Sequence, residues 1–186
     1  MIIIIRDYLE ELYADMPNVS GIEKLVNLKM LSMWKYKPKS RDLTYINMLT
    51  SIEKLGIIQS SITSLKGLEG FKNLRELTLA YSPKLEYLDT IEHFQNSLEV
   101  LECDVCRNLK NYDYIGKLSN LETLRLSKCG DIQSLKFIKS LPLLKFLVFL
   151  QMNVVDGDLS PCVGIEYVRF TDKKHYSHKC KDFIKT

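Results

Sequence analysis

Apolar residues recur along the chain in the pattern LxxLxL, in which L stands for Leu or another apolar residue. The pattern occurs seven times, and successive copies begin 24, 22, 24, 23, 23 and 21 residues apart. Self-similarity at a nearly constant spacing of about 20–50 residues is typical of solenoids, in which each repeat packs only on its neighbours. The copies begin at Leu28, Ile52, Leu74, Leu98, Leu121, Leu144 and Ile165.

Each copy combines two periods, as the third copy shows. Residues 74–79 alternate between apolar and polar positions, which predicts a β-strand. In residues 85–94 the apolar positions recur every three residues, which predicts a short helical or 3-10 return. A single copy cannot bury its own apolar stripe, whereas stacked copies bury it against one another. We therefore expect the strands to form one parallel sheet.

The seven copies resemble the leucine-rich-repeat family, and the resemblance covers residues 19–170. It implies an α/β fold, namely a right-handed solenoid with a curved parallel sheet on the concave face and short helical or 3-10 returns on the convex face. The family usually has Asn or Cys at the ninth position of the motif, where it bonds the backbone of the turn. The four central copies have Ser60, Ser82, Cys106 and Cys129 at this position. The other copies depart from it, which leaves their turn geometry open; they have Tyr36, Met152 and Lys173.

The segments outside the repeats are expected to close the two ends of a single domain spanning residues 1–186. Residues 1–18 are interpreted as an N-terminal cap, with a charged stretch at 7–13 that we expect to be helical and to end at Pro17. Residues 171–186, which are rich in Lys and His, are interpreted as a C-terminal cap or tail. Such caps are needed because an uncovered apolar end of a solenoid promotes aggregation.

Composition and charge narrow the class of protein. The net charge of +3 is too mild to indicate a nucleic-acid partner, which needs a concentrated basic face. The longest apolar runs, residues 1–5 and 146–150, are too short for a membrane span or a signal peptide. The five cysteines are an odd number and mostly far apart, so a disulfide framework is not favoured. We therefore expect a cytoplasmic, monomeric protein.

Cysteine and histidine offer the candidate chemistry, but the repeat accounts for most of it. Cys103 and Cys106 form a CxxC, yet Cys103 falls on the third apolar site of its motif and Cys106 on the turn position. His175, His178 and Cys180 lie close together in sequence, although no fourth zinc ligand is evident and several lysines surround them. No nucleophile, phosphate-binding or metalloprotease motif occurs. We expect neither an enzyme nor a bound cofactor or metal.

A basic stretch, residues 35–41, carries an aromatic ring among its cations and lies where the first strand turns toward the convex side. Such a segment can contact RNA or an acidic protein. A solvated loop is the interpretation we favour, because an isolated run of like charge is weak evidence for binding.

The repeat also predicts which side chains face the concave side. The motif leucines point inward, so the residues between them point outward from the sheet. Aromatic residues and Arg on this face are candidates for binding hot spots, and a central acidic group is a candidate for contact with a basic partner. An apolar strip at residues 146–150 belongs to the same face unless the C-terminal tail covers it. The candidate protein-binding residues are Trp34, Lys35, Glu76, Tyr81, Glu102, Asp104, Arg125, Phe146, Tyr167 and Arg169.

The functional hypothesis is therefore a protein-binding module that acts through its concave face. Residues 154–161 and 172–176 are similar to segments of bacterial repeat proteins, some of which resemble immunity proteins that neutralise a toxin. The alternatives are an adaptor or regulatory subunit, and an RNA-binding protein that uses the 35–41 loop. A secreted adhesin resembling the internalins is a further alternative, which requires an export signal that we do not expect from residues 1–7.

Overall fold

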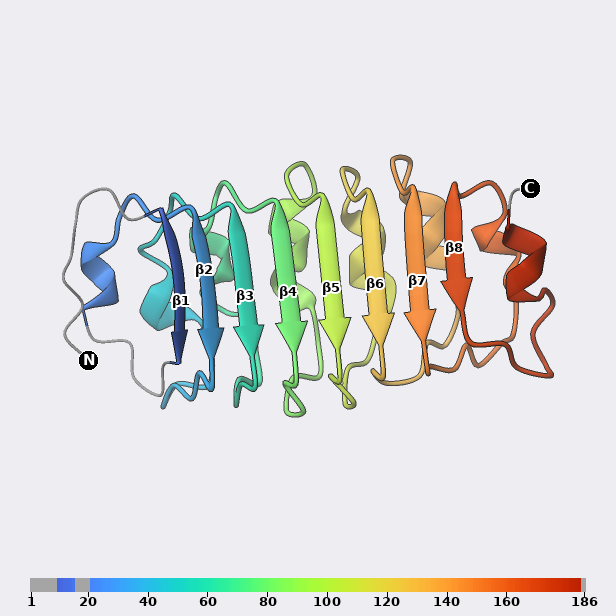
Figure 1. Cartoon of the computed structure of the whole chain (residues 1–186), viewed down its shortest axis with the longest axis horizontal. Helices are drawn as coiled ribbons and strands as arrows, with labels where there is room; N and C mark the ends of the chain where they lie inside the picture. The colour runs from blue at the N-terminus through green and yellow to red at the C-terminus, as the bar shows by residue number, and fades with distance from the viewer. Residues whose placement is uncertain (1–9, 16–20, 185–186) are drawn as a thin grey trace.

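The strands lie side by side in one sheet whose order follows the sequence (Figure 1). A computed structural model describes residues 10–15 and 21–184. Within them, eight strands form a single parallel sheet in the order β1 to β8. The strands are β1 Glu11–Asp15, β2 Met30–Trp34, β3 Lys54–Ile58, β4 Glu76–Ala80, β5 Val100–Asp104, β6 Thr123–Ser127, β7 Phe146–Leu150 and β8 Tyr167–Phe170.

The register of the sheet places corresponding motif positions side by side. Leu55 of β3 pairs with Leu31 of β2 and with Leu77 of β4, and the same alignment continues to β8. These leucines are almost fully buried, as are the residues two positions further along each strand. The core is therefore one continuous stack behind the sheet, as the spacing of the repeats predicts.

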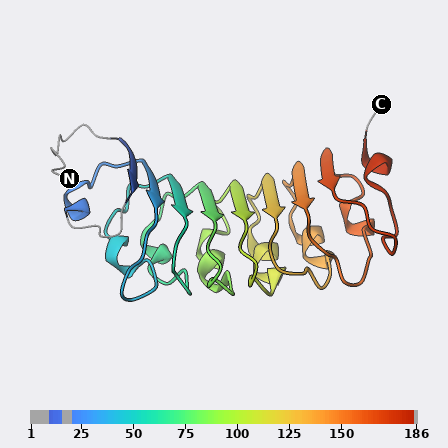
Figure 2. The same cartoon turned by 60° about the horizontal axis from the view of Figure 1, so that its bottom comes forward.

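The connections between successive strands from β2 to β8 are each built on a 3-10 helix that lies behind the sheet, whereas the 3-10 helices at residues 22–24 and 180–183 lie at the two ends of the row of strands (Figures 1 and 2). Figure 2 shows the ends of the row of strands raised above its middle, so the strands line the concave side and the returns the convex side. The 3-10 helices are η1 Ile22–Lys24, η2 Thr44–Ile46, η3 Leu68–Gly70, η4 Asp89–Phe94, η5 Tyr112–Lys117, η6 Lys136–Ser140, η7 Ser160–Cys162 and η8 Cys180–Phe183.

The turn after each strand has a recurrent conformation that the sequence does not signal. The residue that follows each of β2 to β7 has a positive φ, although none of these residues is Gly or Asn. In the middle of the sheet, for example, Val105 has φ 55° and donates its N–H to the carbonyl of Ser127 on the next strand. The six residues are Lys35, Gln59, Tyr81, Val105, Lys128 and Gln151. The turns of the first and sixth copies thus follow the central ones, despite Tyr36 and Met152 at the ninth position.

The side chains at the ninth position of the motif hydrogen-bond the backbone in the central copies, as expected. The thiol of Cys106 donates to the carbonyl of Leu79 at 3.5 Å, and the thiol of Cys129 donates to the carbonyl of Cys103 at 3.4 Å. Each of these bonds reaches the strand of the preceding repeat. These two side chains therefore tie neighbouring repeats together at the turn.

The N-terminal end differs from the expected helical cap. Residues 11–13 belong to strand β1, while Pro17 and residues 7–9 lie outside the described residues. The reason is the edge of β2, whose backbone groups need partners: the N–H groups of Lys29 and Met30 both bond the carbonyl of Glu10. A strand satisfies this edge, whereas a helix does not.

The C-terminal segment packs against the last repeat. The buried ring of Tyr176 packs edge-on against Phe170, and its hydroxyl accepts the N–H of Val154 at 3.0 Å. Phe183 of η8 contacts Phe170 in the same edge-on manner. The segment therefore covers the end of the core beyond β8.

The alternation of β7 leads to the first prediction. Phe149 is 1% exposed and stacks on Phe170, with 5.0 Å between ring centroids, whereas Phe146 on the same strand is 40% exposed. We expect Phe149→Ala to reduce the free energy of unfolding by about 3–5 kcal/mol, because it removes a buried ring and leaves a cavity. The matched variant Phe146→Ala should cost about 1 kcal/mol or less. Urea unfolding measures both, and similar losses would contradict the assignment of the two faces.

The strained turns lead to the second prediction. A left-handed conformation costs a β-branched residue about 1–2 kcal/mol, and Asn tolerates it better. Val105→Asn should therefore raise the free energy of unfolding by about 0.5–1 kcal/mol. Val163→Asn is the control, because Val163 is exposed and has an ordinary φ of −65°. Thermal melts in which both variants shift equally would argue against strain at Val105.

Candidate protein-binding surface

The concave face exposes large aromatic side chains near both ends of the sheet. Trp34 at the end of β2 is 45% exposed, and Tyr167 on β8 is 46% exposed. Phe146 on the adjacent strand β7 contacts Tyr167, with ring centroids 5.9 Å apart. Tyr81, which follows β4, is exposed as well. Four of the ten predicted residues are thus aromatic rings that solvent reaches in the free protein, where a partner can bury them.

The central charges of this face are paired within the protein. Glu76 forms an ion pair with Lys54 at 2.8 Å, and Glu102 forms one with Arg125 at 2.6 Å. Both pairs join residues directly opposite each other on neighbouring strands. Of the predicted acidic group, only Asp104 has no ion-pair partner among the described residues. The middle of the face is therefore close to neutral, rather than acidic as the sequence alone indicates.

The apolar strip on β7 is open. Phe146 and Leu150 are 40% and 37% exposed, and Val148 between them is half-buried. The C-terminal segment packs beyond β8 against the end of the core and leaves this strip free (Figure 1). Arg169, exposed on the neighbouring strand, faces the same side and gives the strip a cationic border.

The basic stretch at residues 35–41 does not present its aromatic ring to solvent. Tyr36 is 1% exposed, and its hydroxyl donates to the carbonyl of Asp42 at 3.3 Å. Burial raises the pKa of Tyr36 to about 12. Lys35 is engaged as well, because its ammonium pairs with Asp15 of β1 at 2.8 Å. A base cannot stack on a ring that is buried in this way, so the RNA-binding alternative keeps the positive charges of the loop but loses its aromatic ring.

The cysteines lie largely in the core. Cys103, Cys106 and Cys162 are buried, whereas Cys129 and Cys180 are partly exposed. Burial raises the pKa of Cys103 and raises that of Cys162 to about 12. A hydrogen bond between Cys106 and Cys129 raises the pKa of the first thiol and lowers that of the second. The CxxC therefore occupies the positions that the repeat assigns to it.

Each histidine of the C-terminal segment has a hydrogen-bond partner, one in the last repeats and one within the segment itself. His175 lies 3.0 Å from the carbonyl of Val154 through its Nε2, and His178 lies 2.8 Å from the hydroxyl of Ser177. Among the described residues, no group of three or more His, Cys, Asp or Glu side chains is placed to hold a metal ion. In the same part of the chain, no helix has the length and apolar character needed to cross a bilayer.

Two features of the concave face were not predicted as parts of the site, although the predicted residue Glu76 lines the second of them. Strand β1 adds the exposed side chain of Tyr13, which lies in register with Ser32 of β2. The β2–β4 region also forms a shallow depression around Gly56. No repeat motif marks β1, and the depression depends on neighbours from three different repeats.

Comparison with solved structures places the fold among leucine-rich repeats. Internalin C2 from Listeria monocytogenes has a TM-score of 0.64 at 21% identity, over 87% of this chain and 80% of its own. Internalin InlF from the same organism gives 0.59 at 19% identity, over 88% of this chain and 56% of its own. The functional domain of InlJ from Listeria monocytogenes, which includes a cysteine ladder, gives 0.66 at 18% identity, over 88% and 36%.

These comparisons confirm the fold, and at such identities they show the fold alone. The chain is a leucine-rich-repeat solenoid with one open parallel sheet. No protein-family model and no curated protein matches the sequence. What the concave face binds must therefore be argued from its own residues.

The thiols lead to a prediction that separates packing from reactivity. At pH 8, iodoacetamide should modify Cys129 and Cys180 in the folded protein and leave Cys103, Cys106 and Cys162 intact. The buried thiols lack access, and a raised pKa keeps the proportion of thiolate low at this pH. Mass spectrometry of peptides counts the labels, and denatured protein, in which all five should react, is the control. Rapid labelling of folded Cys103 would contradict its place in the core.

Proposed function

We propose that this chain is a non-catalytic protein-binding module whose binding site is the concave face of the sheet. The observation that carries the proposal is the set of exposed aromatic rings on that face, at Trp34, Phe146 and Tyr167. A folded protein gains stability by burying such rings, and aromatic side chains are the ones that most often dominate binding energy at protein interfaces. Parallel strands provide the rigid support that a preformed interface needs.

The character of the partner follows from the charges of the face. Because Glu76 and Glu102 are already paired with Lys54 and Arg125, the centre offers a partner few unpaired charges. The attraction then comes mainly from apolar and aromatic contact, with Arg169 and Asp104 available at separate places for specific polar contacts. A protein surface with its own apolar patch matches this pattern, whereas the phosphate backbone of a nucleic acid requires concentrated positive charge.

Neutralisation of a toxin is the narrower form of the proposal, and an adaptor role is its rival. The similarity of residues 154–161 and 172–176 to bacterial repeat proteins supports the first. Identification of the bound protein decides between them, because a toxin whose activity falls on binding supports immunity, and a subunit of a larger complex supports the adaptor role.

The binding proposal is tested by immobilising the protein, capturing partners from a cell lysate and measuring the affinity of each purified partner. Trp34→Ala, and separately Phe146→Ala with Tyr167→Ala, should weaken binding about tenfold or more, because truncation of a hot-spot ring typically costs at least about 1.4 kcal/mol.

The controls are Tyr45→Ala and Tyr87→Ala, because these rings lie outside the strands and are as exposed as Trp34, at 48% and 45% against 45%. Both controls should bind as the wild type does. Loss of binding in the control variants with retention in the strand variants would move the site away from the concave face. Thermal melts of every variant separate lost contact from lost folding.

A further inference from the structure

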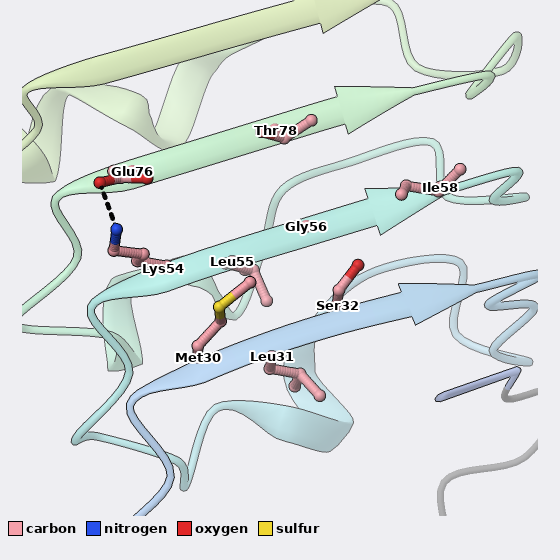
Figure 3. A pocket seen from close by; sticks show the side chains of 9 residues that line it. All are labelled: Met30, Leu31, Ser32, Lys54, Leu55, Gly56, Ile58, Glu76 and Thr78. Carbon is pink, nitrogen blue, oxygen red and sulfur yellow. Dashed lines mark ion pairs between the residues drawn. The ribbon is translucent and has the colours of Figure 1, made fainter. Parts of the chain in front are cut away.

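A depression of about 240 Å³ interrupts the concave face between β2 and β4 (Figure 3). The side chains of Met30 and Ile58 stand at opposite ends of it, and the backbone around Gly56 forms its floor. The ion pair of Lys54 and Glu76 lies at one side. The depression is too small for a drug-sized ligand, which needs about 300–1,000 Å³, but cavities of about 150 Å³ hold a benzene ring.

The depression exists because Gly56 has no side chain. Gly56 lies between Ser32 and Thr78 in the register of the sheet. Its φ is not positive, so its backbone conformation is one that other residues adopt. A Cβ at this position would enter the open space and lie 3.0 Å from the hydroxyl of Ser32. The glycine therefore keeps this part of the face open without being required by the backbone.

Ser32 supplies an unused hydrogen-bonding group. Its side chain is directed from β2 toward the space above Gly56 (Figure 3). The residue is only 8% exposed, yet within residues 10–15 and 21–184 its hydroxyl has no hydrogen-bond partner. This hydroxyl is not enclosed, because among the described residues the only fully buried side-chain polar atom without a partner is Oγ1 of Thr90. It faces the open depression, so a group that enters the depression can take the place of water and hydrogen-bond it.

The lining selects the chemistry of the occupant. Met30 and Ile58 give apolar walls, and a thioether makes favourable contacts with aromatic rings. The charges of Lys54 and Glu76 are bonded to each other, so no free charge is offered to a Lys, Arg or Asp side chain. The lining therefore favours an aromatic and mostly apolar occupant, with one group at its tip that hydrogen-bonds a hydroxyl. Tyrosine meets each of these requirements.

We propose that the depression over Gly56 is a socket for one tyrosine side chain of the protein that binds the concave face, with its phenol hydroxyl bonded to Ser32. The proposal rests on the protein-binding function and makes it more specific. The socket fixes where along the sheet the partner is anchored. Trp34, which follows Ser32 by two residues on β2, contacts the same part of the partner.

The socket is tested without a partner, by titrating isotope-labelled protein with N-acetyl-tyrosinamide and with N-acetyl-phenylalaninamide. The amide resonances of Ser32 and Gly56 report binding by nuclear magnetic resonance. The tyrosine amide should bind about threefold to tenfold more tightly than the phenylalanine amide, the factor that one net hydrogen bond confers. Ser32→Ala should remove this preference and leave the weaker binding of both amides.

The second part of the experiment fills the socket by substituting Gly56. Gly56→Ala should weaken binding of both amides, and Gly56→Val should abolish it, because the added methyl groups occupy the space of the ring. Thermal melts establish that each variant folds. No shift at Ser32 and Gly56, equal affinity of the wild type for the two amides, or shifts that persist in Gly56→Val would each overturn the socket.

The experiments distinguish rejection of the tyrosine socket from rejection of the proposed protein-binding function. If Trp34→Ala abolishes capture of a partner while the tyrosine amide leaves Ser32 and Gly56 unperturbed, the concave site stands and the socket is rejected. If the amide binds as expected while the strand variants capture partners normally, the proposed function is rejected.

Discussion

The parallel register of the strands is the constraint on which the rest of the molecule depends. It aligns Leu31, Leu55 and Leu77 and their counterparts up to β8, so one set of positions fills the core and the alternate set forms the concave face. A slip by one residue in any strand would exchange the two sets. The strands tolerate no such variation. The repeat length nevertheless varies between 21 and 24 residues, and this variation is accommodated in the turns and 3-10 returns.

The repeat spacing predicts β2 to β8 almost completely, because the same leucines are both the signal in the sequence and the cause of the register. Strand β1 is not predicted, because residues 11–15 contain no LxxLxL motif. Their charges instead favour an exposed helix. What makes them a strand is the unpaired edge of β2, which a local pattern does not contain. The positive φ of Val105 is not predictable from the sequence for a similar reason. The N–H of Val105 bonds the carbonyl of Ser127 on the next strand, and this conformation is one that valine disfavours.

The alternation of apolar and polar residues along each strand predicts which side chains face outward, but it predicts nothing else about the candidate site. Alternation identifies Trp34, Phe146 and Tyr167 as outward-facing, and the structure exposes them. It does not reveal that Glu102 is neutralised by Arg125, since that requires the residue opposite on another strand. The depression over Gly56 is hidden in the same way, because it arises from residues about two dozen positions apart that only the register brings together.

The geometry of the face also limits the shape of its partner. Trp34 belongs to β2 and Phe146 to β7, five strand spacings apart, or about 24 Å at 4.7–4.9 Å per spacing. The paired charges between the ends supply little net attraction, so the exposed rings at the two ends are the main groups that the proposed site offers to a partner. Under the proposed function, a partner that buries the rings at both ends presents a surface that extends across the strands. Its affinity is then expected to depend more on apolar contact than on ionic strength.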